Sequence, residues 1–164
     1  TIKPKLGWSS EEHAELGYEA WVGGMDLIKD DENLTDQNFN RFARRVELLT
    51  KQRQRAEKET GEVKSALINV TAETKEAIRR AKLLHDNGWE YGMIDVVTTG
   101  WAALQTLRDE FEDLDLAIHA HRAMHAMFTK DEKHGMGMPC LAKLLRCVGV
   151  DQLHAGTVVG KLEG

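Results

Sequence analysis

The feature that most constrains the fold of this chain is its alternation of short β-prone segments with amphipathic, helix-like segments. Six β-prone segments occur, and apolar residues at helical spacing follow the first five. The β-prone segments cover residues 1–3, 25–28, 66–70, 91–97, 116–121 and 153–157. Strands that alternate with helices are typical of βα units on a parallel sheet. The pattern predicts an α/β protein, either an open doubly wound sheet or most of a (β/α)8 barrel, which typically needs about 250 residues.

Local signals predict where the helices begin and end. Ser9 and Glu12 form a capping box at the start of the first helix, and a Gly-Gly pair ends it before the second strand. A second helix is expected over residues 39–61, and we interpret its charged run at residues 51–58 as a solvated face. Further helices are expected at residues 77–84, 101–111 and 138–148.

Composition and charge exclude some classes of function. The net charge of -5 and the pI near 5.8 argue against nucleic acid or an anionic membrane surface as a partner. No apolar run approaches the roughly 20 residues of a membrane span, and no signal peptide is visible. Cys140 and Cys147 would lie about 10 Å apart on one helix, too far for a disulfide. Two free thiols suit a reducing cytoplasm, and we expect both to fill the core.

Polar residues gather where the predicted strands end. In a βα barrel the active site lies at the carboxyl ends of the strands. The polar residues at or just after these ends are Lys3, Lys5, Lys29, Asp31, Glu32, Asn69, Thr71, Asp95, His119, His121, Arg122, His125, His154 and Thr157. A solvated surface with randomly placed charges would not show this order. The sequence therefore predicts a functional site at the carboxyl edge of the sheet.

The tetrad Lys29-Asp30-Asp31-Glu32 has two interpretations. It can be an ordinary polar loop, or its carboxylates can bind a hard cation such as Mg²⁺, which takes oxygen ligands. An ammonium group has no lone pair and cannot join such a site. A neutral lysine amine that carries CO₂ as a carbamate would supply oxygen ligands, and burial favours the neutral amine.

The segment from His119 to His125 is also open to more than one interpretation. His119 and His121 point to one face of a strand and could begin a zinc site, although no further ligand at zinc-like spacing stands out beyond His125. Arg122 beside two histidines suits a phosphate group better, through its bidentate fork, or is structural.

Other residues have plainer expected places. Lys161 lies in a glycine-rich segment and is either a polar loop residue or a charge that a moving loop closes over a substrate. His13, His85 and His134 are expected at the surface. The methionines expected to pack in the core or in loops are Met124, Met127, Met136 and Met138.

Taken together, four segments resemble the large, catalytic chain of ribulose-1,5-bisphosphate carboxylase/oxygenase (RuBisCO). They are residues 1–7, 23–33, 119–125 and 154–164, and their order and intervals also fit that family. The resemblance covers essentially the whole chain, and the sequences of residues 26–35 and 149–154 are most similar to the archaeal form III branch. It implies a (β/α)8 TIM barrel, of which this chain holds about the first five βα units plus the sixth strand and its loop. Residues 1–164 would then be an internal fragment, a partial catalytic domain without the N-terminal domain and the last barrel units.

The resemblance implies a role for each matching residue. Lys29, carbamylated by an activating CO₂, would bind Mg²⁺ together with Asp31 and Glu32. The residues implied in catalysis are Lys3 as base and acid, His121 in proton transfer and Lys161 over the new carboxylate. The residues implied in substrate binding are Thr1, Lys5, Arg122 and His154, with Glu163 at the loop hinge.

The activity implied by the resemblance belongs to a longer parent protein. It is the Mg²⁺-dependent enolisation of ribulose bisphosphate and the addition of CO₂ to give two 3-phosphoglycerates, with O₂ as the competing substrate. A homodimer or higher oligomer in the cytoplasm is implied, in either a carbon-fixation cycle or AMP salvage. Two alternatives stay open: a RuBisCO-like enolase or isomerase with the same metal site, and an inactive truncated remnant.

Overall fold

The computed structural model describes residues 7–131 and 133–156. In this part of the chain five strands form one parallel sheet, in the order in which they follow along the sequence. The strands are β1 (Leu27–Lys29), β2 (Ser65–Asn69), β3 (Tyr91–Asp95), β4 (Ala117–His121) and β5 (Gln152–Leu153). The predicted strand at residues 1–3 lies outside the described residues.

The strand order decides between the two predicted architectures. A doubly wound sheet reverses its strand order at a switch point. Here the order runs from β1 to β5 without reversal, and each neighbouring pair is parallel. The sheet is therefore a curled half-barrel, as expected for part of a TIM barrel, and the open doubly wound alternative is wrong.

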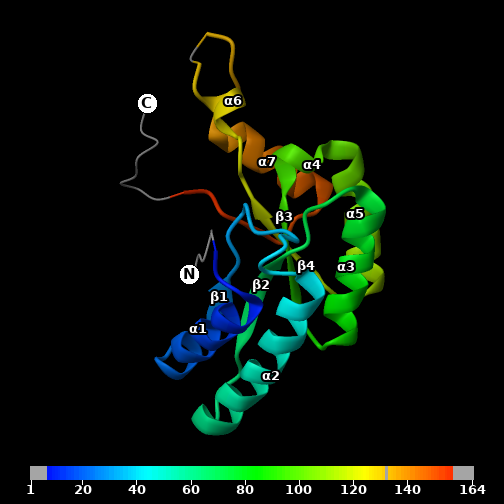
Figure 1. Ribbon diagram of the computed structural model, residues 1–164. Coiled ribbons are helices and arrows are strands. Elements are labelled where there is room, and N and C mark those ends of the chain that lie inside the picture. The colour runs from blue at the N-terminus through cyan, green and yellow to red at the C-terminus, as the bar shows by residue number, and fades with distance from the viewer. Residues whose placement is uncertain (1–6, 132, 157–164) are drawn as a thin grey trace.

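Helices cover the outer face of this sheet, as Figure 1 shows. Successive long helices pack on one another: α1 on α2, α2 on α3, α3 on α5 and α5 on α7. The long helices are α1 (Ser10–Val22), α2 (Phe42–Thr60), α3 (Thr74–Asp86), α5 (Trp101–Asp113) and α7 (Met138–Val148). Two one-turn helices, α4 (Val96–Thr99) and α6 (Ala126–Thr129), follow β3 and β4. None of the helices in the described part of the chain combines the length and apolar character that a membrane crossing requires.

The two faces of the sheet differ in polarity. Ile118 and Ala120 of β4 belong to the hydrophobic core that the helices cover, with Ile28, Ile68 and Ile94 of the other strands. Side chains alternate along a strand, so His119 and His121 point to the opposite, inner face. This alternation directs the polar residues of β4 toward the barrel interior.

Several predicted element boundaries are wrong: β1 begins at Leu27 rather than at residue 25, and β5 covers Gln152–Leu153 and does not continue through residues 154–156. Val96 and Val97 were expected to continue the third strand, but pairing with β4 ends at Asp95 and the valines begin α4, which ends at Thr99 and is capped by Gly100. Phe39 was expected in the second helix, but α2 begins at Phe42, whose amide donates to the Asp36 carboxylate at 2.8 Å.

Several predictions of burial are also wrong. His13 is buried, because its imidazole faces Asp30 across the α1–β1 contact. Cys140 and Cys147 are exposed free thiols, because α7 turns Leu141 and Leu145 to the core instead. Met124 and Met127 are exposed, at 63% and 65%: Met124 lies in the turn that follows β4, one of its two expected places, whereas Met127 lies in α6 and packs in neither the core nor a loop.

Candidate active site

A buried polar residue ends each of the first four strands. These residues are Lys29, Asn69, Asp95 and His121, and each is less than a tenth exposed. Parallel strands bring these ends to one edge of the sheet. His154 follows β5 at the same edge, and its amide donates to the carbonyl of Ala120 at 2.9 Å. The predicted convergence of polar residues at the carboxyl edge is therefore present in the fold.

The residues of the tetrad at the end of β1 have different hydrogen-bond partners. The ammonium of Lys29 donates to the carbonyl of Asp30 at 2.9 Å. The carboxylate of Asp31 accepts from the Asn33 amide and side chain at 2.9 and 3.0 Å. Asn69 donates from its side chain to the carbonyl of Glu32 at 3.0 Å and so ties the tetrad to β2. The backbone that carries Lys29, Asp31 and Glu32 is thus held at the carboxyl end of β1.

Asp30 belongs to a separate, fully buried network. Its Oδ2 accepts from Arg45 Nε at 3.1 Å and from the Asn69 amide at 3.0 Å, and its Oδ1 lies 3.2 Å from His13 Nε2. Burial raises the pKa of Asp30, but Arg45 and His13 outweigh it and lower the pKa to about 2. Asp30 is therefore a carboxylate whose oxygens are directed to the helix layer rather than to the site.

The donor set fits a hard cation only in part. Asp31 and Glu32 offer carboxylate oxygens, which are the ligands that Mg²⁺ prefers. Within the described residues, no group of three or more His, Cys, Asp or Glu side chains is arranged to hold a metal ion. Two carboxylates beside a buried lysine are therefore the available set, and the lysine would have to contribute oxygen ligands to complete it.

His121 lies between two carboxylates. Its Nε2 is 3.7 Å from Glu32 Oε2, and its Nδ1 is 3.3 Å from Asp95 Oδ1. The Ala123 amide donates to Nδ1 at 3.1 Å. The ring centroid of His154 lies 5.2 Å away. His121 is thus held with its Nε2 toward Glu32.

His119 is a second histidine on the inner face. Its Nδ1 donates to the Gln152 side-chain oxygen at 3.0 Å, and its Nε2 is buried without a hydrogen-bond partner. Burial, together with the charges of Lys29, His154 and His121, lowers the pKa of His119 to about 4. His119 precedes His121 by two residues, so the sequence correctly predicted that both side chains point to the same face of the strand. The sequence did not predict a specific role for His119.

Arg122 is oriented by its neighbours after β4. One terminal nitrogen lies within hydrogen-bond distance of His125 Nε2, and His125 Nδ1 lies 2.9 Å from the Thr129 hydroxyl. Burial, and then the charges of Arg122 and His121, lower the pKa of His125. A Cβ on Gly156 would lie 2.5 Å from the guanidinium, so only glycine allows this approach. Arg122 is thus fixed at the carboxyl edge, between the segments that follow β4 and β5.

Some predicted site residues lie outside the described part of the chain. They are Thr1, Lys3, Lys5, Thr157, Lys161 and Glu163. The described residues instead add Arg45 and His13, which the sequence analysis did not connect with the site. Arg45 lies between Phe42 and Val46 on the apolar stripe of α2. A charged residue in an apolar stripe was the sequence signal that could have identified Arg45 as a buried, paired residue.

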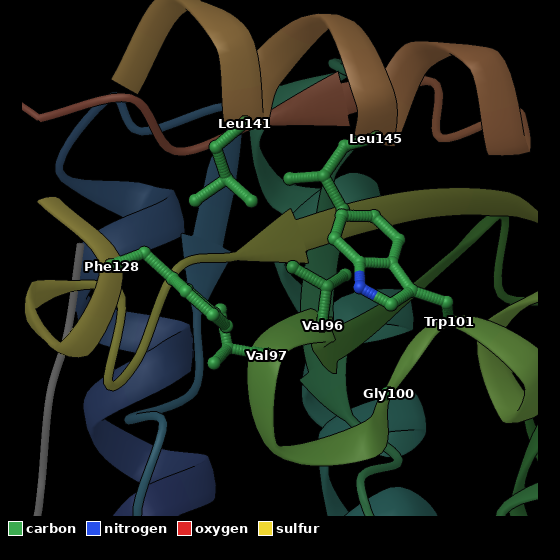
Figure 2. A pocket seen from close by; sticks show the side chains of 7 residues that line it. All are labelled: Val96, Val97, Gly100, Trp101, Phe128, Leu141 and Leu145. Carbon is green, nitrogen blue, oxygen red and sulfur yellow. The ribbon is translucent and has the colours of Figure 1, made fainter. Parts of the chain in front are cut away.

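A small apolar hollow lies beyond the end of β3, lined by residues of α4, α5, α6 and α7. Figure 2 shows Trp101, Val96 and Leu145 pointing into it, with Leu141 and Phe128 from α7 and α6. It contains no titratable side chain. This lining does not suit a phosphorylated substrate, so the polar edge is the candidate active site.

Comparison with known proteins identifies related chains. The family model described as "Ribulose bisphosphate carboxylase large chain, catalytic domain" matches residues 1–164. The protein named ribulose bisphosphate carboxylase from Methanosarcina barkeri is 57% identical over 164 residues, covering 99% of this chain and 38% of its own length. The protein of that name from Pyrococcus abyssi is 57% identical over 162 residues, with the same coverage. The chain thus spans well under half of the length of these curated relatives.

Solved structures show the same similarity. The octameric enzyme from Pyrococcus horikoshii superimposes with a TM-score of 0.93 at 55% identity, over 98% of this chain and 38% of that one. A dimeric archaeal Rubisco from Hyperthermus butylicus gives a TM-score of 0.90 at 52% identity, over 93% of this chain and 36% of that one. The half-barrel therefore corresponds to part of a larger catalytic domain.

Proposed function

Because this chain belongs to the family of ribulose bisphosphate carboxylase large-chain catalytic domains, we propose that its parent protein is a ribulose-1,5-bisphosphate carboxylase/oxygenase. The parent would enolise ribulose bisphosphate and add CO₂ to give two 3-phosphoglycerates, with O₂ as the competing substrate. One observation carries the proposal: Lys29 ends β1 at the carboxyl edge of a half-barrel, Asp31 and Glu32 follow it, and Glu32 Oε2 lies 3.7 Å from His121 Nε2 at that edge, where this fold class performs its chemistry.

Lys29, Asp31 and Glu32 are the proposed holders of Mg²⁺, with an activating CO₂ bound to Lys29 as a carbamate. The two carboxylates alone leave the donor set incomplete, and a carbamate would add the oxygen ligands that the lysine lacks. Bound Mg²⁺ supplies Lewis-acid polarisation of the substrate carbonyl. The chain itself supplies the buried strand end that aligns the three side chains.

The described histidines and Arg122 act on the substrate in this proposal. His121, whose Nε2 faces Glu32, assists proton transfer. Arg122 and His154 hold one phosphate group, and the contact of Arg122 with His125 directs its guanidinium. The role of base and acid falls to Lys3, supported by Lys5, while Thr1 contacts the substrate. Lys161 closes over the site with Glu163 at its hinge.

Residues 1–164 form a partial (β/α)8 catalytic domain in this proposal. The N-terminal domain and the last barrel units would lie in the rest of the parent, since the relatives are more than twice as long. A homodimer or higher oligomer is expected, by analogy with the octameric and dimeric archaeal structures. We assign the parent to the archaeal form III branch, and to the cytoplasm on the basis of its unpaired thiols.

The proposal is tested with the full-length parent, ribulose bisphosphate and labelled CO₂. Mg²⁺-dependent label in an acid-stable product is expected, and Lys29→Ala should abolish it. Lys82→Ala, which changes an exposed lysine on α3, is the matched control and should keep the activity. A folded, Mg²⁺-binding parent that fixes no CO₂ but exchanges a proton on a sugar phosphate would contradict the carboxylase and favour the RuBisCO-like enolase.

A further inference from the structure

Arg45 is a charged residue in the interior of the protein. Its side chain on α2 is fully buried, and its guanidinium carbon lies 5.4 Å from the centroid of the Phe42 ring. A buried charge is strongly unfavourable unless it is paired and its donors are used. The bonds that Arg45 makes therefore show which part of the fold it stabilises.

All three guanidinium nitrogens donate to one short segment, residues 30–40. Nε binds the Asp30 carboxylate at 3.1 Å, and Nη2 binds the carbonyl of Thr35 at 2.9 Å. Nη1 binds both the carbonyl and the side-chain oxygen of Asn40, at 3.2 and 3.1 Å. A single side chain thus holds the segment at its start, middle and end.

The same segment carries two of the three proposed metal ligands. Asp31 and Glu32 follow directly after Asp30, and Lys29 precedes it. Asp30 is also held by His13 of α1 and by the amide of Asn69 at the end of β2. The direction of the Asp30 side chain fixes the backbone from which Lys29 and Asp31 project to the other side.

We propose that Arg45 is a positioning residue for the metal-binding stretch, which acts through residues 30–40 and touches neither metal nor substrate. This inference rests on the proposed function, because it takes Lys29, Asp31 and Glu32 as the ligands. Residues that orient ligands typically change metal affinity or activity by about 10- to 100-fold when they are replaced. Arg45 therefore sets the affinity of the site for Mg²⁺.

The informative variant is Arg45→Lys. Lysine keeps the positive charge but is a compact point donor, so it cannot reach Asp30, Thr35 and Asn40 together. The variant is expected to raise the half-saturating Mg²⁺ concentration about 10- to 100-fold, while kcat at saturating Mg²⁺ and CO₂ stays near the wild-type value. Arg44→Lys is the matched control, because Arg44 is exposed and pairs with Glu11 and Glu47 on the surface.

The measurement uses the full-length parent. Calorimetric titration with Mg²⁺ in bicarbonate buffer gives the affinity directly, and the Mg²⁺ dependence of activation gives it from turnover. Circular dichroism and the oligomer size establish that the variant is folded. A folded Arg45→Lys protein with wild-type Mg²⁺ affinity overturns the inference.

A second variant keeps the test decisive if Arg45→Lys does not fold. Asn40→Ala removes one acceptor of the guanidinium and leaves the carbonyl in place, so a several-fold loss of Mg²⁺ affinity is expected. Unchanged affinity in folded Asn40→Ala overturns the inference. A wild-type parent that binds no Mg²⁺ contradicts the proposed function and the inference together, whereas an active wild type with insensitive variants contradicts the inference alone.

Discussion

At the residue scale, the four charged residues at the end of β1 point to two different parts of the structure. Lys29, Asp31 and Glu32 lie at the inner edge of the sheet, whereas Asp30 lies in the helix layer with Arg45. Lys29 ends β1 and the Asp30 amide still bonds to the carbonyl of Leu67 on β2, so these two successive side chains point to opposite faces, whereas Asp31 and Glu32 lie beyond the strand. Four consecutive charged residues therefore comprise the three proposed metal ligands and one residue of a buried network, rather than one cluster.

Asp30→Asn should strongly destabilise the protein. The amide removes the charge that partners the fully buried Arg45, and breaking a buried pair in this way typically lowers the free energy of unfolding by about 3–5 kcal/mol. Denaturant unfolding of the full-length parent measures the effect. Asp109→Asn, an exposed aspartate on α5, should change stability by less than about 0.5 kcal/mol. Equal stability of the two variants would contradict the account of Asp30.

The same residue predicts a dependence of stability on pH. The pKa of Asp30 is lowered from 3.8 to about 2, so the folded state favours the ionised form. The stabilisation is fully present above the unfolded pKa near 3.8 and is lost as the pH falls toward 2, by about 2 kcal/mol in all. The stability difference between wild type and Asp30→Asn should therefore shrink between pH 4 and pH 2. A difference that stays constant over this range would be inconsistent with an ionised Asp30.

His119 should titrate in acid. Its pKa is lowered from 6.5 to about 4, first by burial, so the ring is neutral near pH 7. The unfolded chain takes up the proton first, so this residue reduces stability as the pH falls from about 6.5 toward 4. NMR titration of the parent, with His119→Asn to assign the resonance, measures the midpoint. A midpoint near 6.5 would show that His119 is not desolvated.

The positions of residues that have a local sequence pattern could be predicted. Polar residues after apolar strands predicted the carboxyl edge, and Lys29, Asn69, Asp95 and His121 all lie there. His13 was wrongly expected at the surface, because its partner Asp30 is 17 positions away and no pattern in α1 indicates the contact. Networks between elements depend on packing that local patterns do not contain.

At the element scale, caps and glycines set where helices and strands lie. Ser9 and Glu12 make the predicted capping box at the start of α1, with both reciprocal bonds present. The one-turn helix α4 was missed, because its two valines favour a strand in isolation. Short turns after strands depend on where pairing ends, which the sequence alone does not indicate.

Gly92→Ala should disturb the contact between β3 and α5. A Cβ at this position would lie 2.6 Å from ring atoms of Phe111, so the ring and its helix must shift. Overpacking of this kind typically costs about 1–3 kcal/mol of stability. Gly137→Ala is the control, because its nearest contact would be an ordinary 3.7 Å. Thermal unfolding of both variants in the parent checks the prediction, and a Gly92→Ala protein as stable as the control would refute it.

At the scale of the whole molecule, strand order is the deciding observation. Both a doubly wound sheet and a barrel show the same βα alternation, so periodicity alone could not separate them. The sequential order of β1 to β5 and the curl of the sheet identify a half-barrel. Within the described residues, β1 and β5 each pair with a single neighbouring strand.

The isolated 164-residue segment should be inactive and prone to aggregate. It spans 38% of the length of its relatives, and strand edges without partners favour association between chains. Size-exclusion chromatography and the CO₂-fixation assay, with the full-length parent beside the segment, test this expectation. A soluble, monomeric segment with carboxylase activity would contradict it.

The most direct test of the central claim is the detection of a carbamate on Lys29. The full-length parent is incubated with ¹³CO₂ and Mg²⁺, and the carbamate is observed by ¹³C NMR, with Lys29→Ala and Lys82→Ala beside it. The account predicts a Mg²⁺-stabilised carbamate signal in wild type and Lys82→Ala that is absent from Lys29→Ala. A parent that fixes CO₂ without any carbamate on Lys29 would contradict the assignment of this strand end as the metal site.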